Sequence, residues 1–152
     1  MRLSHRSKYA LLALFDLAGR PDSGPVPLKE LAERNQIPFK FLEQIFRALR
    51  SAGIVHSQMG AHGGYTLGRP ASEITLGAVI RILDGTLAPV SCISQIAYEP
   101  CTCPDEHTCP LRAVMVRVRQ AIVAVVDSTT LADAAGPRWI AEVGEDTIPI
   151  VS

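Results

Sequence analysis

The strongest constraint on the fold is the spacing of apolar residues, and of the residues typical of turns, between Leu28 and Leu67. Leu28 to Arg34 has the pattern of a short amphipathic helix with Leu28, Leu31 and Ala32 facing inward. After a three-residue link, Pro38 suits the first position of a second helix that stops near Gly53. Its apolar residues recur at three- and four-residue steps and are Phe41, Leu42, Ile45, Phe46 and Leu49. The sequence therefore predicts two helices joined by a tight turn.

A hairpin is expected directly after this helix pair. Ile54 to Gln58 and Tyr65 to Leu67 have strand character, and they flank the glycine-bearing turn Met59 to Gly64. Before the pair, Ser4 is a candidate cap for a helix that runs to about Ala18. We therefore predict a mainly α fold with a small β-hairpin wing, that is, a winged helix-turn-helix followed by a long C-terminal dimerisation helix.

Charge is divided unevenly along the 152 residues, although the chain is formally neutral. Residues 1 to 70 hold ten Lys and Arg against five Asp and Glu, whereas residues 71 to 152 hold five against ten. A net charge of +5 on one half and −5 on the other indicates a basic half that meets a polyanion. No stretch approaches a membrane span, because Asp16 interrupts the apolar run after Tyr9, so we expect a cytoplasmic protein.

The outer face of the second helix carries the side chains that suit contacts with DNA bases. If its apolar residues face the core, Lys40, Glu43, Gln44 and Arg47 lie together on the opposite face. Such side chains pair with guanine, adenine or cytosine edges in the major groove, although an isolated helix would merely solvate them. Further candidate DNA contacts flank this face at the hairpin tip and the N-terminus, and they are His62, Arg2, Arg6 and Lys8.

Four cysteines, Cys92, Cys101, Cys103 and Cys109, fall in a loop that extends from Thr86 to Cys109. In a reducing cytosol such cysteines are better explained as metal ligands or redox thiols than as structural disulfides. Cys109 precedes Pro110 at a helix start, where free amides favour a thiolate. Soft thiolates suit an iron-sulfur cluster, four cysteines with His107 would also suit zinc, and a metal-free thiol switch is a third possibility.

A long helix is predicted from Pro110 to about Asp127. Its apolar seam predicts either an internal core helix or, as we favour, a homodimer interface. The seam comprises Leu111, Met115, Val118, Ile122 and Val125. A short helix at Leu131 to Ala135 follows. We divide the chain into a DNA-binding domain (1–85), a cysteine-bearing sensor loop (86–109), the dimerisation helix with the short terminal helix (110–135) and a tail (136–152).

Three segments resemble a known family. LSHRSKYALLAL from Leu3, VPLKELAERNQIPFKFLEQIFRALRSAGIV from Val26 and GGYTLGRPASEITLGAV from Gly63 are similar to the Rrf-type repressors, which include iron-sulfur regulators of the IscR, NsrR and RirA types. The resemblance covers roughly residues 1 to 130. It implies a dimeric winged-helix regulator that binds a pseudo-palindromic DNA operator with an affinity set by a [2Fe-2S] or [4Fe-4S] cluster.

The resemblance also marks where this chain departs from its family. Cys92, Cys103 and Cys109 match the three family cysteines, while Cys101 is an additional thiol. Met59 stands where the family commonly has an arginine in the wing, and Lys8 stands where a ligating carboxylate can occur. Besides the cluster-controlled repressor, the alternatives are a zinc- or thiol-based regulator without a cluster and an iron-sulfur electron-transfer protein. No arrangement of catalytic residues is evident, so an enzyme is not expected.

Overall fold

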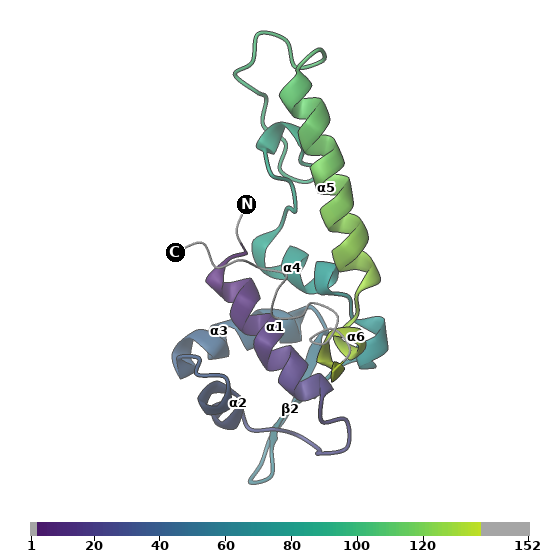
Figure 1. Ribbon diagram of the computed structural model, residues 1–152. Coiled ribbons are helices and arrows are strands. Elements are labelled where there is room, and N and C mark those ends of the chain that lie inside the picture. Colours follow the sequence, from purple (N-terminus) through teal and green to yellow (C-terminus); the bar gives the residue numbers. More distant parts are fainter. Residues whose placement is uncertain (1–2, 138–152) are drawn as a thin grey trace, which may run out of the picture.

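The fold consists of helices from which one short hairpin projects, as Figure 1 shows for the computed structural model, which describes residues 3–137. Arg2 and residues 138–152 of the predicted tail lie outside the described residues. The elements in chain order are α1 (His5–Ala18), α2 (Leu28–Arg34), α3 (Phe39–Ser51), β1 (Val55–Gln58), β2 (Gly64–Leu67), the 3-10 turn η1 (Ala71–Glu73), α4 (Leu76–Asp84), the 3-10 turn η2 (Ser91–Ile93), α5 (Pro110–Ser128) and α6 (Leu131–Ala135). The predicted mainly α fold with a hairpin wing is confirmed.

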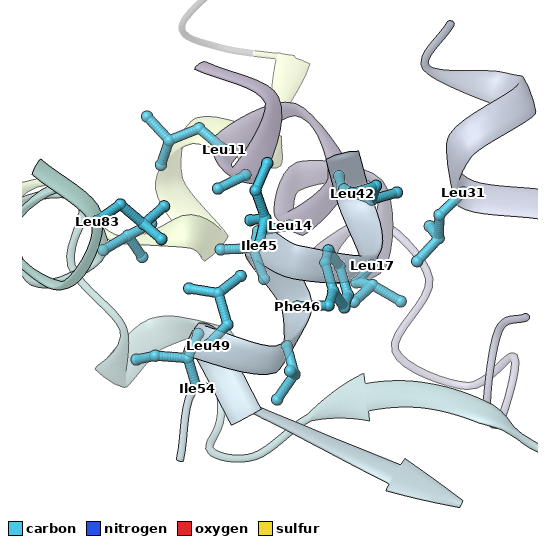
Figure 2. Close-up of a cluster of buried hydrophobic side chains, with 14 of the residues drawn as sticks. Leu11, Leu14, Leu17, Leu31, Leu42, Ile45, Phe46, Leu49, Ile54 and Leu83 are labelled. Atoms are coloured by element: carbon cyan, nitrogen blue, oxygen red, sulfur yellow. The ribbon is translucent and has the colours of Figure 1, made fainter. Parts of the chain in front are cut away.

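A single apolar core holds the first part of the chain together. Helix α3 contributes Leu42, Ile45, Phe46 and Leu49, all fully buried, and Figure 2 shows them among leucines from α1, α2 and α4. The ring of Phe46 meets Tyr65 of β2 edge-on, with ring centroids 5.0 Å apart. These contacts confirm the inward face predicted for α3. The remaining labelled members in Figure 2 are Leu11, Leu14, Leu17, Leu31, Ile54 and Leu83.

The prediction for α3 differs from the structure at its first residue. Phe41 does pack against the core, half-buried and edge-on to Tyr9 of α1, with ring centroids 5.8 Å apart. Pro38 has extended backbone torsions and caps the helix, so the first helical residue is Phe39. The Pro38 carbonyl accepts from the amides of Phe41 and Leu42, both at 3.0 Å, but its side chain offers no acceptor to the first turn of the helix.

The hairpin is extended by one bridge to the segment before α2. Strands β1 and β2 pair antiparallel with Val55 opposite Leu67, and Tyr65 also exchanges backbone hydrogen bonds of 3.0 and 2.8 Å with Val26. Gly64 makes this possible, since a Cβ there would overlap the backbone of Val26. The wing is thereby joined to the chain that leads into α2.

Helix α5 stands away from the other helices, with the segment after α4 running beside it to its far end (Figure 1). No residue of α5 is buried, and Leu111, Val114 and Val125 are each more than half exposed. The alternative of an internal core helix is therefore wrong within the protomer. Only Val123 and Val126, near its C-terminus, pack against the main core.

Candidate functional site

The turn between α2 and α3 is fixed by local hydrogen bonds. Gln36 has a positive φ of 53°, which turns the chain sharply, and the Ile37 amide donates to the Ala32 carbonyl at 2.8 Å. The Asn35 side chain donates to the Leu31 carbonyl at 2.9 Å and to Asp16 of α1 at 3.1 Å. The two helices therefore keep a constant angle, and α3 is held in a defined direction.

The carboxylate of Asp16 connects this helix pair to α1. Asp16 accepts Arg20 at 3.1 Å and Arg34 at 3.2 Å, and Arg20 reaches Glu30 of α2 at 3.0 Å. Exposed ion pairs contribute little to stability, but Asp16 is largely buried and has several donors at once. The network orients α2 against α1 and leaves the outer face of α3 free.

That outer face carries the four predicted side chains. Lys40 and Arg47 are largely exposed, at 87% and 73%, while Glu43 lies between them at 31%. The Glu43 carboxylate forms ion pairs with Lys40 at 3.7 Å and with Arg47 at 3.4 Å. Gln44 is exposed on the same helix. Such surface pairs exchange at small cost, so the same groups are available to base edges.

The other predicted DNA contacts lie on neighbouring elements. His62 is exposed in the wing turn, next to Met59 at 92% exposure, and Arg6 and Lys8 are exposed on α1. The sequence-based prediction omitted Arg50, which lies in the last turn of α3 and donates to Ser57 of β1 at 3.1 Å. Its basic side chain in the last helical turn was visible in the sequence, but its contact with the wing depends on the hairpin register.

Cys101, Cys103 and Cys109 lie close together at the N-terminal end of α5. Cys101 and Cys103 form a disulfide, and the Cys109 sulfur lies 3.7 Å from that of Cys103. Cys109 caps α5, as predicted from Pro110 at the first helical position. Cys92 is a buried free thiol in η2, and His107 is exposed.

The disulfide bears on the expected metal site. Within residues 3–137, no three His, Cys, Asp or Glu side chains are arranged to hold a metal ion. Two of the four sulfurs are bonded to each other, so only Cys92 and Cys109 remain as thiols. With that bond reduced, the donor set is four thiols in one loop, and soft thiolates are the ligands of iron-sulfur clusters and of zinc.

Polar contacts fasten the cysteine loop to α5. Arg112 donates to the Cys92 carbonyl at 3.4 Å and lies 3.7 Å from Glu106. Glu106 in turn accepts the Tyr98 hydroxyl at 2.6 Å, and this hydrogen bond raises the pKa of Tyr98. Further along the helix, Arg119 donates to Gln95 at 2.8 Å. Arg112 and Arg119 therefore connect the cysteine loop to α5.

The opposite end of α5 is tied to α4. Arg81 donates two hydrogen bonds to Asp127, at 2.6 and 2.9 Å, and these bonds hold the pKa of Asp127 below its ordinary value. Gly77 gives Asp127 room, because a Cβ there would overlap its carboxylate. The Leu76 amide donates to the Thr129 carbonyl at 2.9 Å just beyond the helix. One helix thus links the cysteine loop to the fold that holds α3.

The comparisons with known proteins agree with this arrangement. The Rrf2 family profile, described as an iron-dependent transcriptional regulator, matches residues 3–137. The chain belongs to the Rrf2 family. It is 40% identical over 140 residues to an rrf2-like HTH-type transcriptional regulator of Rhodobacter capsulatus, covering 88% of this chain and 93% of the relative. It is also 34% identical to the HTH-type transcriptional regulator IscR of Yersinia pseudotuberculosis, covering 95% and 85%.

Solved structures of Rrf2 regulators have the same fold. The structure of CymR, the global cysteine regulator of Bacillus subtilis, superposes with a TM-score of 0.75 at 36% identity and covers 89% of this chain and 96% of that one. The IscR structure from T. potens superposes with a TM-score of 0.69 at 32% identity, covering 97% and 92%. This Rrf2 protein is therefore a DNA-binding transcriptional regulator and not an enzyme.

The family assignment confirms the resemblance noted in the sequence and disfavours the alternative of an electron-transfer protein, because the relatives are named as regulators. The relatives include both IscR and CymR, so the family alone leaves the sensing chemistry of this chain open. None of the helices described for residues 3–137 combines the length and apolar character needed to cross a membrane.

Proposed function

We propose that this Rrf2 protein is a cytoplasmic, homodimeric repressor whose affinity for a pseudo-palindromic operator is controlled by its cysteine loop. The observation that carries the proposal is the gathering of Cys101, Cys103 and Cys109 at the N-terminal end of α5, whose other end is anchored to α4. The functional division is a DNA-binding domain at 1–85, a sensor loop at 86–109 and a dimerisation segment at 110–135. A ligand state that rearranges the loop shifts the DNA-binding equilibrium only by its differential affinity for the two arrangements.

Two copies of α5 would form the dimer. Leu111, Val118 and Val125 are exposed in the protomer, and Met115 and Ile122 are half-buried, although all five are apolar. Water-exposed apolar side chains along a 19-residue helix are the pattern of a surface that a second helix covers. A two-fold axis through this interface would present two α3 helices to two half-sites.

DNA binding would use the outer face of α3, comprising Lys40, Glu43, Gln44 and Arg47. His62 in the wing and Arg2, Arg6 and Lys8 near the N-terminus would contact phosphates. Because these contacts replace condensed cations, affinity should fall steeply as salt rises. A binding isotherm that is insensitive to salt would contradict this interface.

The sensor would be an iron-sulfur cluster held by thiolates of the cysteine loop. Cys92, Cys103 and Cys109 are the proposed main ligands, and Cys101 is the proposed additional one. The cluster would supply a redox- and nitric-oxide-sensitive centre that also reports iron supply. Ligation requires a reduced Cys101–Cys103 pair, so the disulfide state and the cluster state exclude each other.

A metal-free thiol switch is the second candidate, and the Cys101–Cys103 disulfide favours it. In this case hydrogen peroxide oxidises both thiols, the sulfur–sulfur bond forms, and the two thiol protons leave with the peroxide oxygens as two molecules of water. A relative supports this candidate, since a structure of Staphylococcus aureus CymR is described as an oxidised form, with 34% identity and a TM-score of 0.71. Zinc on the same four thiols is the remaining possibility.

Anaerobic purification with analysis of iron, sulfide and zinc tests these possibilities. We expect a brown protein with stoichiometric iron and sulfide, whereas colourless protein with zinc, or without metal, would refute the cluster. Alanine at Cys92, Cys103 or Cys109 should abolish assembly, while Cys101→Ala should leave an altered or less stable cluster. If Cys101→Ala loses the cluster and Cys103→Ala keeps it, the ligand assignment is wrong.

A further inference from the structure

An aromatic side chain at the start of α3 has no role in the core. Phe39 is the first helical residue, and 42% of its surface is exposed. The core positions of this helix begin three residues later at Leu42. A large apolar side chain held at the surface is informative when it belongs to a continuous apolar patch.

Phe39 does belong to such a patch. Together with Ala32, Ile37 and Pro38 it lines a groove of about 600 Å³ between the end of α2 and the start of α3. Lys29, Glu33 and Gln36 also line it. The groove is therefore an apolar surface bordered by polar groups, placed at the turn of the helix pair.

The groove adjoins the proposed base-contacting face. Phe39 and Glu43 are four residues apart on one helix, so their side chains are neighbours one turn apart. In helix-turn-helix proteins, the N-terminal residues of the second helix contact base edges in the major groove. Phe39 is thus the first side chain of α3 to meet the bases when Glu43 faces them.

Charge around the groove favours a nucleic acid as its occupant. Lys29 and Lys40 are both at least 80% exposed, and each pairs loosely with a glutamate, Lys29 with Glu33 at 3.9 Å and Lys40 with Glu43 at 3.7 Å. Exposed pairs of this kind are weak, so both cations can turn to phosphates. The basic half of the chain, residues 1–70, has a net charge of +5. The positive charge attracts a polyanion, and the place of Phe39 at the start of α3 would direct its ring to the bases once α3 enters the major groove.

The major groove of DNA presents one apolar substituent, the C5-methyl group of thymine, which phenylalanine and other apolar side chains contact. We propose that Phe39 contacts a thymine methyl group in each half-site of the operator and so selects thymine next to the base that Glu43 contacts. The inference rests on the proposed placement of α3 in the major groove. A protein segment bound in the same groove is the competing occupant.

Replacing thymine by deoxyuridine removes the methyl group alone and leaves every hydrogen bond of the base pair intact. Operator duplexes selected by the full-length protein are scanned with symmetric thymine-to-deoxyuridine replacements, and Kd is measured at fixed salt. We expect one symmetric pair of replacements to weaken wild-type binding by about fourfold per half-site, since burying one carbon group is worth about 0.8 kcal/mol. Binding of Phe39→Ala should be weaker on the thymine duplex and unchanged by the same replacement.

Two further variants separate this contact from general effects. Phe39→Leu keeps an apolar side chain and should retain part of the methyl dependence. Ile96→Ala removes an exposed apolar side chain, 70% exposed, from the cysteine loop and should keep the full wild-type dependence. Thermal unfolding checks that each variant folds, and the wild-type scan needs no variant at all.

The outcomes distinguish this inference from the proposed function. Salt-dependent operator binding with no methyl-sensitive position, or with equal sensitivity in Phe39→Ala, overturns the Phe39 contact and leaves the operator-binding dimer standing. An operator without thymine in either half-site overturns it as well. Loss of salt-dependent operator binding in the wild type would instead refute the proposed function itself.

Discussion

Val118→Glu tests whether α5 forms the dimer. Val118 is 38% exposed in the protomer, so a glutamate there can remain solvated when the chain is monomeric. Glutamate is also a better helix former than valine, and the protomer should therefore fold normally. In a two-helix interface, by contrast, the carboxylate would lose its water.

The expected effect follows from symmetry. Each copy loses about 1 kcal/mol of apolar burial, and desolvation of each carboxylate costs at least about 2 kcal/mol. Because a two-fold interface contains every residue twice, the total is about 6 kcal/mol, or a dimer Kd roughly 10⁴-fold weaker. Sedimentation equilibrium measures this change directly.

Gln120→Glu is the matched control, because it places the same charge on the same helix at an exposed polar residue. It should leave the dimer Kd within a few-fold of wild type. An unchanged dimer in Val118→Glu would remove this part of α5 from the interface, and equal dissociation of both variants would mean that the effect is one of charge alone.

Two further predictions concern DNA contacts and the anchor of α5. Glu43→Ala should relax base preference at one operator position by about 1 to 3 kcal/mol, measured as competition between operators that differ there; uniform weakening at all positions would argue against a base contact. Asp127→Asn should destabilise the protein by at most about 1 kcal/mol at pH 7, because the pair with Arg81 is about 40% exposed. The pKa of Asp127 is lowered on folding, so this contribution is present above the ordinary carboxyl range and is lost as the pH falls through the folded pKa. Urea unfolding at pH 7 and pH 3 should show a smaller difference at pH 3 than at pH 7, and a difference of equal size at both pH values would attribute it to packing.

Periodicity and caps predict most of the fold. The strong apolar spacing of α3 locates its core face, and Ser4 caps α1 as its side-chain chemistry predicts. Phe41 is only half-buried because its ring packs against Tyr9 of another helix at the edge of the core, a contact that no single-helix pattern contains. Pro38 caps α3 and is not its first helical residue, a distinction that the sequence leaves open because the fixed φ of proline suits both positions.

The candidate site is less accessible to prediction. The outer face of α3 follows from its core face by elimination, so Lys40 and Glu43 could be named from spacing alone. The pairing of Cys101 with Cys103 could not, since one intervening residue brings their sulfurs together only for a particular bend of the loop. The contact of Arg112 with the Cys92 carbonyl likewise depends on how the loop folds back along α5.

The bridge between Val26 and Tyr65 limits what a signal can change. Together with the contact between Arg50 and Ser57, it joins the wing, the turn and α3 into one unit whose internal geometry is fixed. A movement of α5, which is about 28 Å long from its 19 residues, would carry that unit as a whole. In the proposed dimer, such a movement would change the distance between the two α3 helices and leave each helix-turn-helix unchanged. The two cysteine states would therefore prefer operators with different spacer lengths between half-sites of the same sequence.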